Sequence, residues 1–257
     1  MRSNEKCQLK EHWFIISVVL MLLVMSFWGC RRAKYSSLDS ITIDGVKSYY
    51  MYSNVESGSK EGLPVIIIID HPFGGVTNPE RFAGKFDEPV LLICCRLLDD
   101  LSPDTPVEHN TVWQKKRQVF LTLFQGYKDH FGFDERRVYL TGFSSTGVYA
   151  WMLAYDRPDL YSGVVAMSAP SYPQQIQQKL ESGKSIVTVV VRGRNDAAFP
   201  ERLAQERQTG RVIESRNPHS KFVLIQGEDH GSVQEYWLQH LNYVLQFSKP
   251  DVSPSGS

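Results

Sequence analysis

The stretch Arg137–Trp151 combines a short apolar strand, a sharp turn and the start of a helix, and it constrains the fold more than any other part of the sequence. Its first part, Val138–Thr141, is rich in β-branched and aromatic residues, which predicts a buried strand. After Gly147 the apolar side chains recur at helical spacing, which predicts a helix. Ser144 occupies the turn between the two elements, and Gly142 precedes it by two positions.

A serine in such a turn is well placed to act as a nucleophile. Its hydroxyl projects from the turn, while the next backbone N–H group and the positive helix N-terminus face a developing negative charge. The pattern is Gly-x-Ser-x-Gly with one departure, because Thr146 occupies the second glycine position and Gly147 follows one residue later. We therefore predict more crowding near Ser144 than a second glycine would cause.

Ser145 is the competing nucleophile within the same stretch. The run Ser145–Gly147 restores the trailing glycine, but this register puts Phe143 in the leading glycine position. We favour Ser144 because Gly142 relieves the close approach at the tightest point of the turn. The alternative to both is a serine-rich turn without catalytic function, so the interpretation depends on partners elsewhere in the chain.

Apolar runs and helical stripes alternate along the rest of the chain. Ile41–Tyr52 contains two alternating runs around Asp44 and Gly45, which predicts a β-hairpin. Further apolar runs are too short for helices and rich in β-branched residues, so we expect buried strands. The alternation predicts an α/β fold with a mostly parallel central sheet and helices on both faces. Strands are expected at Pro64–Asp70, Val90–Cys95, Val138–Thr141, Val164–Ser168, Ile186–Val191 and Lys221–Ile225, and helices at Thr111–Lys128, after Gly147 and at Ser232–Ser248.

Sheets of this kind place functional residues at the carboxyl ends of their strands. Asp196 follows the predicted strand Ile186–Val191, and His230 follows Lys221–Ile225. Ser144, Asp196 and His230 therefore occur in the chain order that a hydrolase uses when histidine deprotonates serine and a carboxylate orients the histidine.

Asp196 has two rivals for the position of the carboxylate. Glu228 and Asp229 come directly before His230, and side chains so close in sequence are poorly placed to reach its Nδ1 from the side opposite the serine. Among the other histidines, His240 lies beside apolar residues of the last predicted helix, His12 lies in the N-terminal segment, and His109, His130 and His219 lie in polar loops. We expect those histidines to be structural or exposed.

The N-terminal segment has the pattern of an export signal. Trp13–Gly29 contains no charged residue, and Arg2, Lys6 and Lys10 precede it. The following run, which ends at Cys30, resembles the lipobox of bacterial lipoproteins, in which the cysteine is lipidated after cleavage. The alternative is an uncleaved membrane anchor, since a helix over this apolar run would be about 25 Å long.

Either interpretation tethers an exported domain to a membrane. We divide the chain into a signal or anchor at 1–29, a spacer at 30–40, one catalytic domain at 41–249 and a disordered tail at 250–257. With 42% hydrophobic residues, 257 residues suffice for one large α/β core.

Charge and cysteine usage argue against two other classes of function. The sequence has 28 basic and 28 acidic residues, so no strongly basic surface for nucleic acid is expected. The adjacent Cys94 and Cys95 lie in an apolar run and are expected to pack in the core. Because Cys and His do not occur at metal-binding spacing, we expect no metal site and no cofactor.

Four motifs along the chain are considered together: Arg137–Ser144, Arg157–Tyr161, Gly193–Asp196 and Asp229–Gly231. They resemble the α/β-hydrolases, and within them the extracellular esterases related to polyhydroxybutyrate depolymerases and feruloyl esterases. The resemblance covers about Leu63 to Phe247. It implies that Ser144 is the nucleophile, Asp196 the acid and His230 the base.

The same resemblance assigns the oxyanion hole. His71–Phe73 matches the family's loop, usually His-Gly-x, so the backbone N–H groups of Phe73 and Ser145 would hold the oxyanion. Pro72 departs from this pattern, and because proline has no N–H group and a fixed φ, the loop is expected to differ in shape. The expected donor, Phe73, is retained.

The leading hypothesis is a serine esterase that cleaves carboxylic esters through an acyl-enzyme. Only 17 residues separate Ser168 from Ile186, too few for a lid domain, so we expect an open site for bulky or polymer-attached esters flanked by Phe73, Phe143 and Tyr172. Two alternatives stay open: a peptidase that uses the same residues, and a weakly active, membrane-tethered binding protein.

Overall fold

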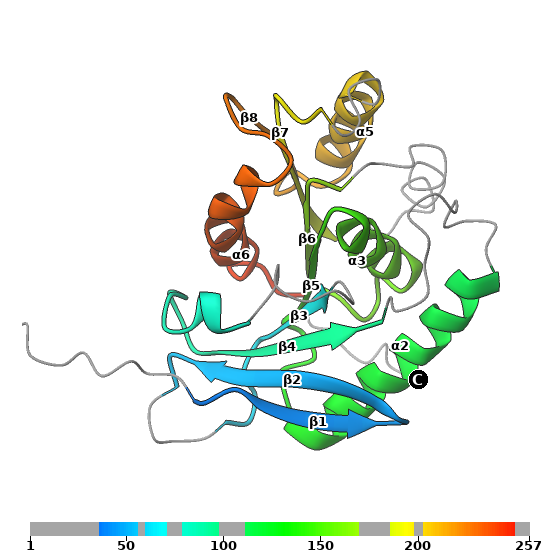
Figure 1. Ribbon diagram of the computed structural model, residues 1–257, viewed down its shortest axis with the longest axis vertical. Coiled ribbons are helices and arrows are strands. Elements are labelled where there is room, and N and C mark those ends of the chain that lie inside the picture. Colours follow the sequence, from blue (N-terminus) through cyan, green and yellow to red (C-terminus); the bar gives the residue numbers. More distant parts are fainter. Residues whose placement is uncertain are drawn as a thin grey trace, which may run out of the picture. The chain divides into compact units, whose positions relative to one another are not determined.

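Figure 1 shows the computed structural model, which describes residues 36–55, 60–70, 79–97, 111–169, 186–197 and 203–249. The chain divides into Met1–Lys34 and Tyr35–Ser257, and every described residue belongs to the second unit. Cys30, the loop His71–Phe73, Tyr172, the residues 170–185 and the tail 250–257 lie outside the described residues.

Eight strands form one sheet in the order β1-β2-β4-β3-β5-β6-β7-β8. The strands from β4 to β8 pair in parallel, whereas β1 and β2 pair antiparallel at one edge. The predicted α/β fold with a mostly parallel sheet is thus confirmed. The bounds are β1 Asp39–Ile43, β2 Val46–Ser53, β3 Val65–Asp70, β4 Val90–Arg96, β5 Val138–Phe143, β6 Gly163–Met167, β7 Val187–Gly193 and β8 Lys221–Ile225.

The first two strands form the predicted hairpin. Ile43 pairs with Val46, so only Asp44 and Gly45 remain in the turn. Both have positive φ values, 49° and 78°, as a two-residue turn between right-twisted strands requires.

Helices cover both faces of the sheet. On one face lie α2 (Thr111–Phe131), α3 (Ser145–Asp156) and α5 (Leu203–Arg216) (Figure 1). On the other lie η1 (Pro79–Phe82), η4 (Ser232–Tyr236) and α6 (Trp237–Val244). Among the described residues, no helix is both long and apolar enough to span a bilayer.

The core has two halves because strand side chains alternate between the faces of the sheet. In β3, Ile67 and Ile69 pack into the half under α2 and α3, whereas Ile66 and Ile68 pack into the half under α6. All four are fully buried, and each such side chain contributes about 1.5–3 kcal/mol of hydrophobic stabilisation. This burial holds the carboxyl ends of the central strands in a fixed arrangement.

One helical prediction was wrong, and one helix was not predicted. The helix predicted at Ser232–Ser248 is broken, because Ser232–Tyr236 is a 3₁₀ turn and α6 ends at Val244. The Asp229 carboxylate accepts hydrogen bonds from the N–H groups of Gly231 and Ser232, which tightens this first turn. In addition, α5 was not predicted, because its sequence is mostly polar and its interior Gly210 breaks the helical signal.

Candidate active site

Ser144 lies between the last residue of β5 and the first residue of α3. Its backbone adopts φ 56° and ψ −125°, a conformation that non-glycine residues rarely adopt. Such strain costs about 1–3 kcal/mol and persists only where the surrounding structure enforces it. Here the Ser144 N–H donates to Met167 O at 2.8 Å, and Val148 N–H donates to Ser144 O at 3.2 Å. The serine is therefore held at a strained elbow by β6 and by α3.

Gly142 makes this elbow possible. A Cβ atom at this position would overlap the Thr146 carbonyl group and lie 2.8 Å from Gly147 N. The turn therefore requires glycine at position 142, in agreement with the choice of Ser144 over Ser145.

Thr146 does not produce the crowding that the sequence predicted. Its side chain is buried, and its hydroxyl accepts from Phe143 N at 2.9 Å and donates to Phe143 O at 2.8 Å. The close approach falls instead at Gly147, where a Cβ atom would lie 3.0 Å from both Ala169 Cβ and Gly142 O. The shifted glycine is thus explained, because Gly147 is the residue that contacts β6 and the start of its loop.

Asp196 and His230 lie in two neighbouring loops, past the ends of β7 and β8. His230 Nδ1 is 2.8 Å from Asp196 Oδ2, and only one per cent of the Asp196 side chain is exposed. Asn195 N–H donates to Glu228 O at 2.9 Å, which joins the loops. Gly193 permits this contact, because a Cβ atom there would overlap the backbone carbonyl of Glu228.

The two rival carboxylates are engaged elsewhere. Asp229 caps the η4 turn, and the hydrogen bonds from Ser232 and then from Gly231 lower the pKa of its carboxyl. Glu228 Oε1 accepts a hydrogen bond from the Tyr236 hydroxyl at 3.3 Å. The structure therefore places Asp196, and neither rival, against the imidazole.

Two residues near Ser144, Phe143 and Ser168, contact His230. The ring of Phe143, which precedes the serine, meets the His230 ring edge to face at 5.1 Å between centroids. Ser168 follows Met167, the residue that accepts from Ser144 N–H, and its hydroxyl donates to His230 O at 2.9 Å. Ser168 also has a positive φ of 45°. The carboxyl end of β6 thus contacts both the elbow and the histidine loop.

Arg192 is the site residue that sequence analysis missed. It lies within β7, which extends two residues farther than predicted, and its side chain is three per cent exposed. Its Nε atom is 3.6 Å from Asp196 Oδ2, the oxygen that faces His230. A signal was present, because Arg192 is a charged residue at the end of an otherwise apolar run and lies four positions before Asp196.

Other expected features contribute less to this site. Ser145 is the first residue of α3, so its N–H belongs to the helix turn without intrahelical partners, whereas Phe73 lies outside the described residues. His240 is buried on α6.

Among the described residues, no three His, Cys, Asp or Glu side chains are grouped closely enough to hold a metal ion. Cys94 and Cys95 are buried free thiols, as expected for core residues.

Comparisons with known proteins identify the architecture. No family model matches the sequence, and no curated protein matches it. Among solved structures, Est1E from Butyrivibrio proteoclasticus matches with a TM-score of 0.57 and 15% identity, over 82% of this chain and 98% of Est1E. The chain has an α/β-hydrolase fold.

Two further solved structures match to a similar extent. The S954A mutant of the feruloyl esterase module from Clostridium thermocellum, complexed with sinapinate, matches with a TM-score of 0.58 and 12% identity, over 89% of this chain and 92% of the module. A putative dienelactone hydrolase from Klebsiella pneumoniae matches with a TM-score of 0.56 and 18% identity, over 82% of this chain and 98% of that protein. At these identities the likeness establishes the fold alone.

Proposed function

We propose that this α/β-hydrolase-fold protein is a serine hydrolase that cleaves carboxylic esters through an acyl-enzyme. The observation that carries the proposal is the hydrogen bond between His230 Nδ1 and the buried Asp196 carboxylate, beside a strained serine elbow. Such an arrangement is costly to build and has no evident structural purpose, since a simple turn would connect β5 and α3 without strain.

In the proposed first step, Ser144 Oγ attacks the ester carbonyl carbon while His230 Nε2 accepts the hydroxyl proton. Asp196 holds Nδ1–H and stabilises the imidazolium that forms. The protonated histidine then gives its proton to the leaving alcohol as the carbonyl–oxygen bond breaks. Water attacks the acyl-enzyme in the same way, which releases the acid and restores Ser144.

The tetrahedral intermediate needs donors for its negatively charged oxygen. The N–H group of Ser145 is one proposed donor, because Ser145 directly follows the elbow serine and begins α3. The second proposed donor is the N–H group of Phe73, by resemblance to the family's oxyanion loop. All the proposed chemistry uses side chains and backbone groups of this chain.

Fluorophosphonate labelling tests the nucleophile without knowledge of the substrate. The wild type should be labelled, Ser144→Ala should lose the label, and the matched control Ser145→Ala should largely keep it. Loss of the label in Ser145→Ala alone would assign the other register. A folded wild type that takes no label would instead favour a binding protein on a hydrolase scaffold.

We further propose bulky or polymer-attached acyl or aryl esters as substrates. The 17 residues between Ser168 and Ile186 are too few for a lid domain that could enclose a lipid tail. A panel of short-chain, long-chain and hydroxycinnamate esters, compared by kcat/KM, tests this. A preference for long-chain esters by tenfold, about 1.4 kcal/mol of transition-state stabilisation, would contradict the open site.

A peptidase would use the same catalytic residues, so the leaving group must be varied on its own. An ester and an amide of one acyl group should be compared with the same enzyme preparation. Faster turnover of the ester alone does not suffice, because esters are intrinsically more reactive. The ester assignment therefore requires that no peptide amide is turned over above the rate of Ser144→Ala.

Export and membrane attachment form a separate proposal. It rests on the basic residues before Trp13–Gly29, on this uncharged run itself and on Cys30 directly after it. Cells fed a labelled fatty acid should label the wild type but not Cys30→Ser. Unlabelled protein that keeps residues 1–29 would establish an uncleaved anchor instead.

A further inference from the structure

Phe143, the last residue of β5, places its side chain against the proposed base. Its ring centroid lies 5.1 Å from that of the His230 imidazole, and the two ring planes meet at 63°, so the edge of one ring faces the plane of the other. The backbone of Phe143 continues directly into the strained Ser144. The elbow that holds the nucleophile therefore also brings an aromatic ring to the base.

The backbone of Phe143 is held through both its N–H and its carbonyl group. Thr146 Oγ1 accepts a hydrogen bond from Phe143 N at 2.9 Å and donates one to Phe143 O at 2.8 Å. Thr146 is buried, so water does not compete for these bonds. A glycine at position 146 has no hydroxyl and could not make them. The threonine that departs from the elbow pattern thus fixes the residue beside the base.

A second aromatic ring fixes the Phe143 side chain. The rings of Phe143 and Trp237 lie 6.4 Å apart between centroids, with their planes at 38°. Trp237 is fully buried, and its Nε1–H donates to Thr141 Oγ1 at 2.6 Å, while that hydroxyl donates to Val165 O at 2.7 Å. The Phe143 ring is therefore packed against an indole that buried hydrogen bonds hold to β5 and β6.

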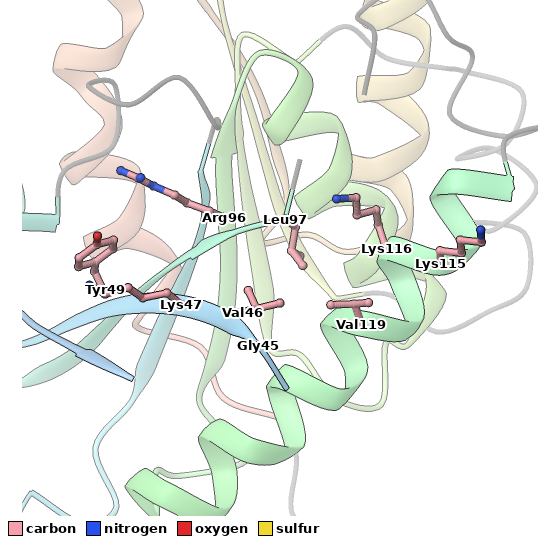
Figure 2. A pocket seen from close by; sticks show the side chains of 9 residues that line it. All are labelled: Gly45, Val46, Lys47, Tyr49, Arg96, Leu97, Lys115, Lys116 and Val119. Atoms are coloured by element: carbon pink, nitrogen blue, oxygen red, sulfur yellow. The ribbon is translucent and has the colours of Figure 1, made fainter. Parts of the chain in front are cut away.

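This arrangement is separate from the cavity that Figure 2 shows. That cavity has a volume of about 420 Å³ and is lined by residues of the β1–β2 hairpin, the end of β4 and α2. Neither Phe143 nor His230 is among its lining residues. The contact between these two rings therefore needs an explanation within the candidate active site.

The negative charge that Asp196 offers to His230 is shared with a second cation. Asp196 Oδ2 is 2.8 Å from His230 Nδ1 and 3.6 Å from Arg192 Nε. In the proposed mechanism His230 takes up the serine proton, so an imidazolium and a guanidinium then lie beside one carboxylate, and like charges repel. A further group that stabilises the imidazolium would lower the barrier to both acylation and deacylation, since each passes through this cation.

We propose that Phe143 is a positioning residue that acts through His230: the π face of its ring receives the imidazolium and stabilises the positive charge in both transition states. The inference rests on the proposed serine hydrolase function. A cation within about 6 Å of an aromatic ring centroid is attracted by the negative face of the ring, more strongly where water is excluded. The His230 ring lies within this distance, and Phe143 is half-buried.

This role differs measurably from the one that the sequence suggested, in which Phe143 flanks the acyl group of the ester. A wall of the acyl site changes KM, by an amount that depends on the acyl group. A ring that stabilises the imidazolium changes kcat, and it does so equally for every ester, because the same cation forms with each of them.

Ring fluorination at position 143 tests the proposal, because fluorine atoms withdraw charge from the π face and barely change the size of the ring. Mono-, di- and trifluorinated phenylalanine should be introduced there in the full-length protein, and kcat and KM measured with phenyl acetate and phenyl butyrate. We expect kcat to fall with each added fluorine, by about fivefold in total and equally for both esters, with KM unchanged within about twofold. The rate of fluorophosphonate labelling should fall in the same order. Phe143→Leu changes the packing as well as the π face, so the fluorinated series decides.

Phe247 provides the matched control. It is half-buried and contacts the ring of His219, with 4.5 Å between the centroids. This second pair of phenylalanine and histidine lies at the amino end of β8, whereas His230 follows its carboxyl end. The same fluorinated residues at position 247 should leave kcat unchanged.

The outcomes separate this inference from the function on which it rests. A kcat that stays equal or rises along the series at position 143, or a change confined to KM, would overturn the role of Phe143 and leave the proposed function intact. Turnover that survives in Ser144→Ala, or a wild type with neither turnover nor label, would overturn the proposed function and this inference with it.

Discussion

Arg192 Nε lies 3.6 Å from Asp196 Oδ2, the carboxylate oxygen that is 2.8 Å from His230 Nδ1. Both members of this ion pair are almost completely buried. Two buried charges lose most of their hydration, and their mutual attraction offsets this loss only while both are present. The stability of the fold and the orientation of the Asp196 carboxylate are therefore coupled through Arg192.

We predict that Arg192→Met lowers the free energy of unfolding by about 3–5 kcal/mol, because it removes a cation beside a buried carboxylate. Asp196→Asn should lower it by a comparable amount, because it removes the carboxylate beside the buried Arg192 cation. The double variant R192M/D196N should lose less than the sum of the single losses, by at least about 1 kcal/mol. Urea unfolding of the four proteins gives this coupling energy directly.

An exposed ion pair provides the control for this cycle. Arg157 and Asp159 form a pair in which about two fifths of each side chain is exposed, so solvent screens its charges. Arg157→Met should lower the unfolding free energy by no more than about 1 kcal/mol. If the loss of unfolding free energy in R192M/D196N equals the sum of the two single losses within about 0.5 kcal/mol, Arg192 and Asp196 are not coupled.

The elbow allows a second prediction, on its two glycines. Gly142→Ala should destabilise the protein by about 3 kcal/mol or more, because the new methyl group meets rigid backbone at Thr146. Gly147→Ala, with contacts near 3.0 Å, should cost about 1–3 kcal/mol. Gly227→Ala is the control, since it lies in open space with φ 81° and should cost only about 1–2 kcal/mol of backbone strain. Thermal unfolding ranks the three, and a Gly142→Ala protein as stable as Gly147→Ala would contradict the steric argument.

Sequence alone could predict the sheet because its signal is local. A run such as Val65–Asp70 is buried on both faces, so its composition reports its environment directly. The approach of Asp196 to His230 could also be expected, since residues that follow neighbouring parallel strands meet at one edge of the sheet. In both cases the pattern along the chain determines the position in space.

The features that could not be predicted depend on contacts between distant elements. Ser168 donates to His230 O across 62 positions of sequence, and nothing in its own surroundings in the chain indicates this. Helix α5 is mostly polar and is held by packing against β8, where Gly210 lies against the Phe222 side chain. The role of Thr146 depends on a hydroxyl geometry that residue type does not reveal.

Thr146 gives the third prediction. Its hydroxyl both accepts from and donates to the backbone of Phe143, so Thr146→Val should lower the unfolding free energy by about 1–3 kcal/mol. Thr146→Ser keeps the hydroxyl and should lose less. Thr146→Gly restores the usual glycine pattern, yet it should also lose stability and slow fluorophosphonate labelling, because the elbow loses its internal hydrogen bonds. Faster labelling of Thr146→Gly than of wild type would show that threonine only crowds the turn.

His240 gives the last prediction, on pH dependence. It is buried on α6, and burial, followed by the positive charge of Lys221, lowers the pKa of its imidazole to about 4. The ordinary value is 6.5, so between these two pH values the unfolded chain binds a proton that the folded protein excludes. Stability is therefore complete above pH 6.5 and is lost as the pH falls toward 4.

Between pH 7 and pH 5 this single group should remove about 2 kcal/mol of unfolding free energy. His240→Leu cannot take up a proton and should lose correspondingly less over the same interval, whatever its stability at pH 7. His219→Asn changes an exposed histidine and serves as the control for replacing a histidine. Urea unfolding at the two pH values measures all three proteins. If His240→Leu loses as much stability on acidification as the wild type, the acid sensitivity originates elsewhere in the fold.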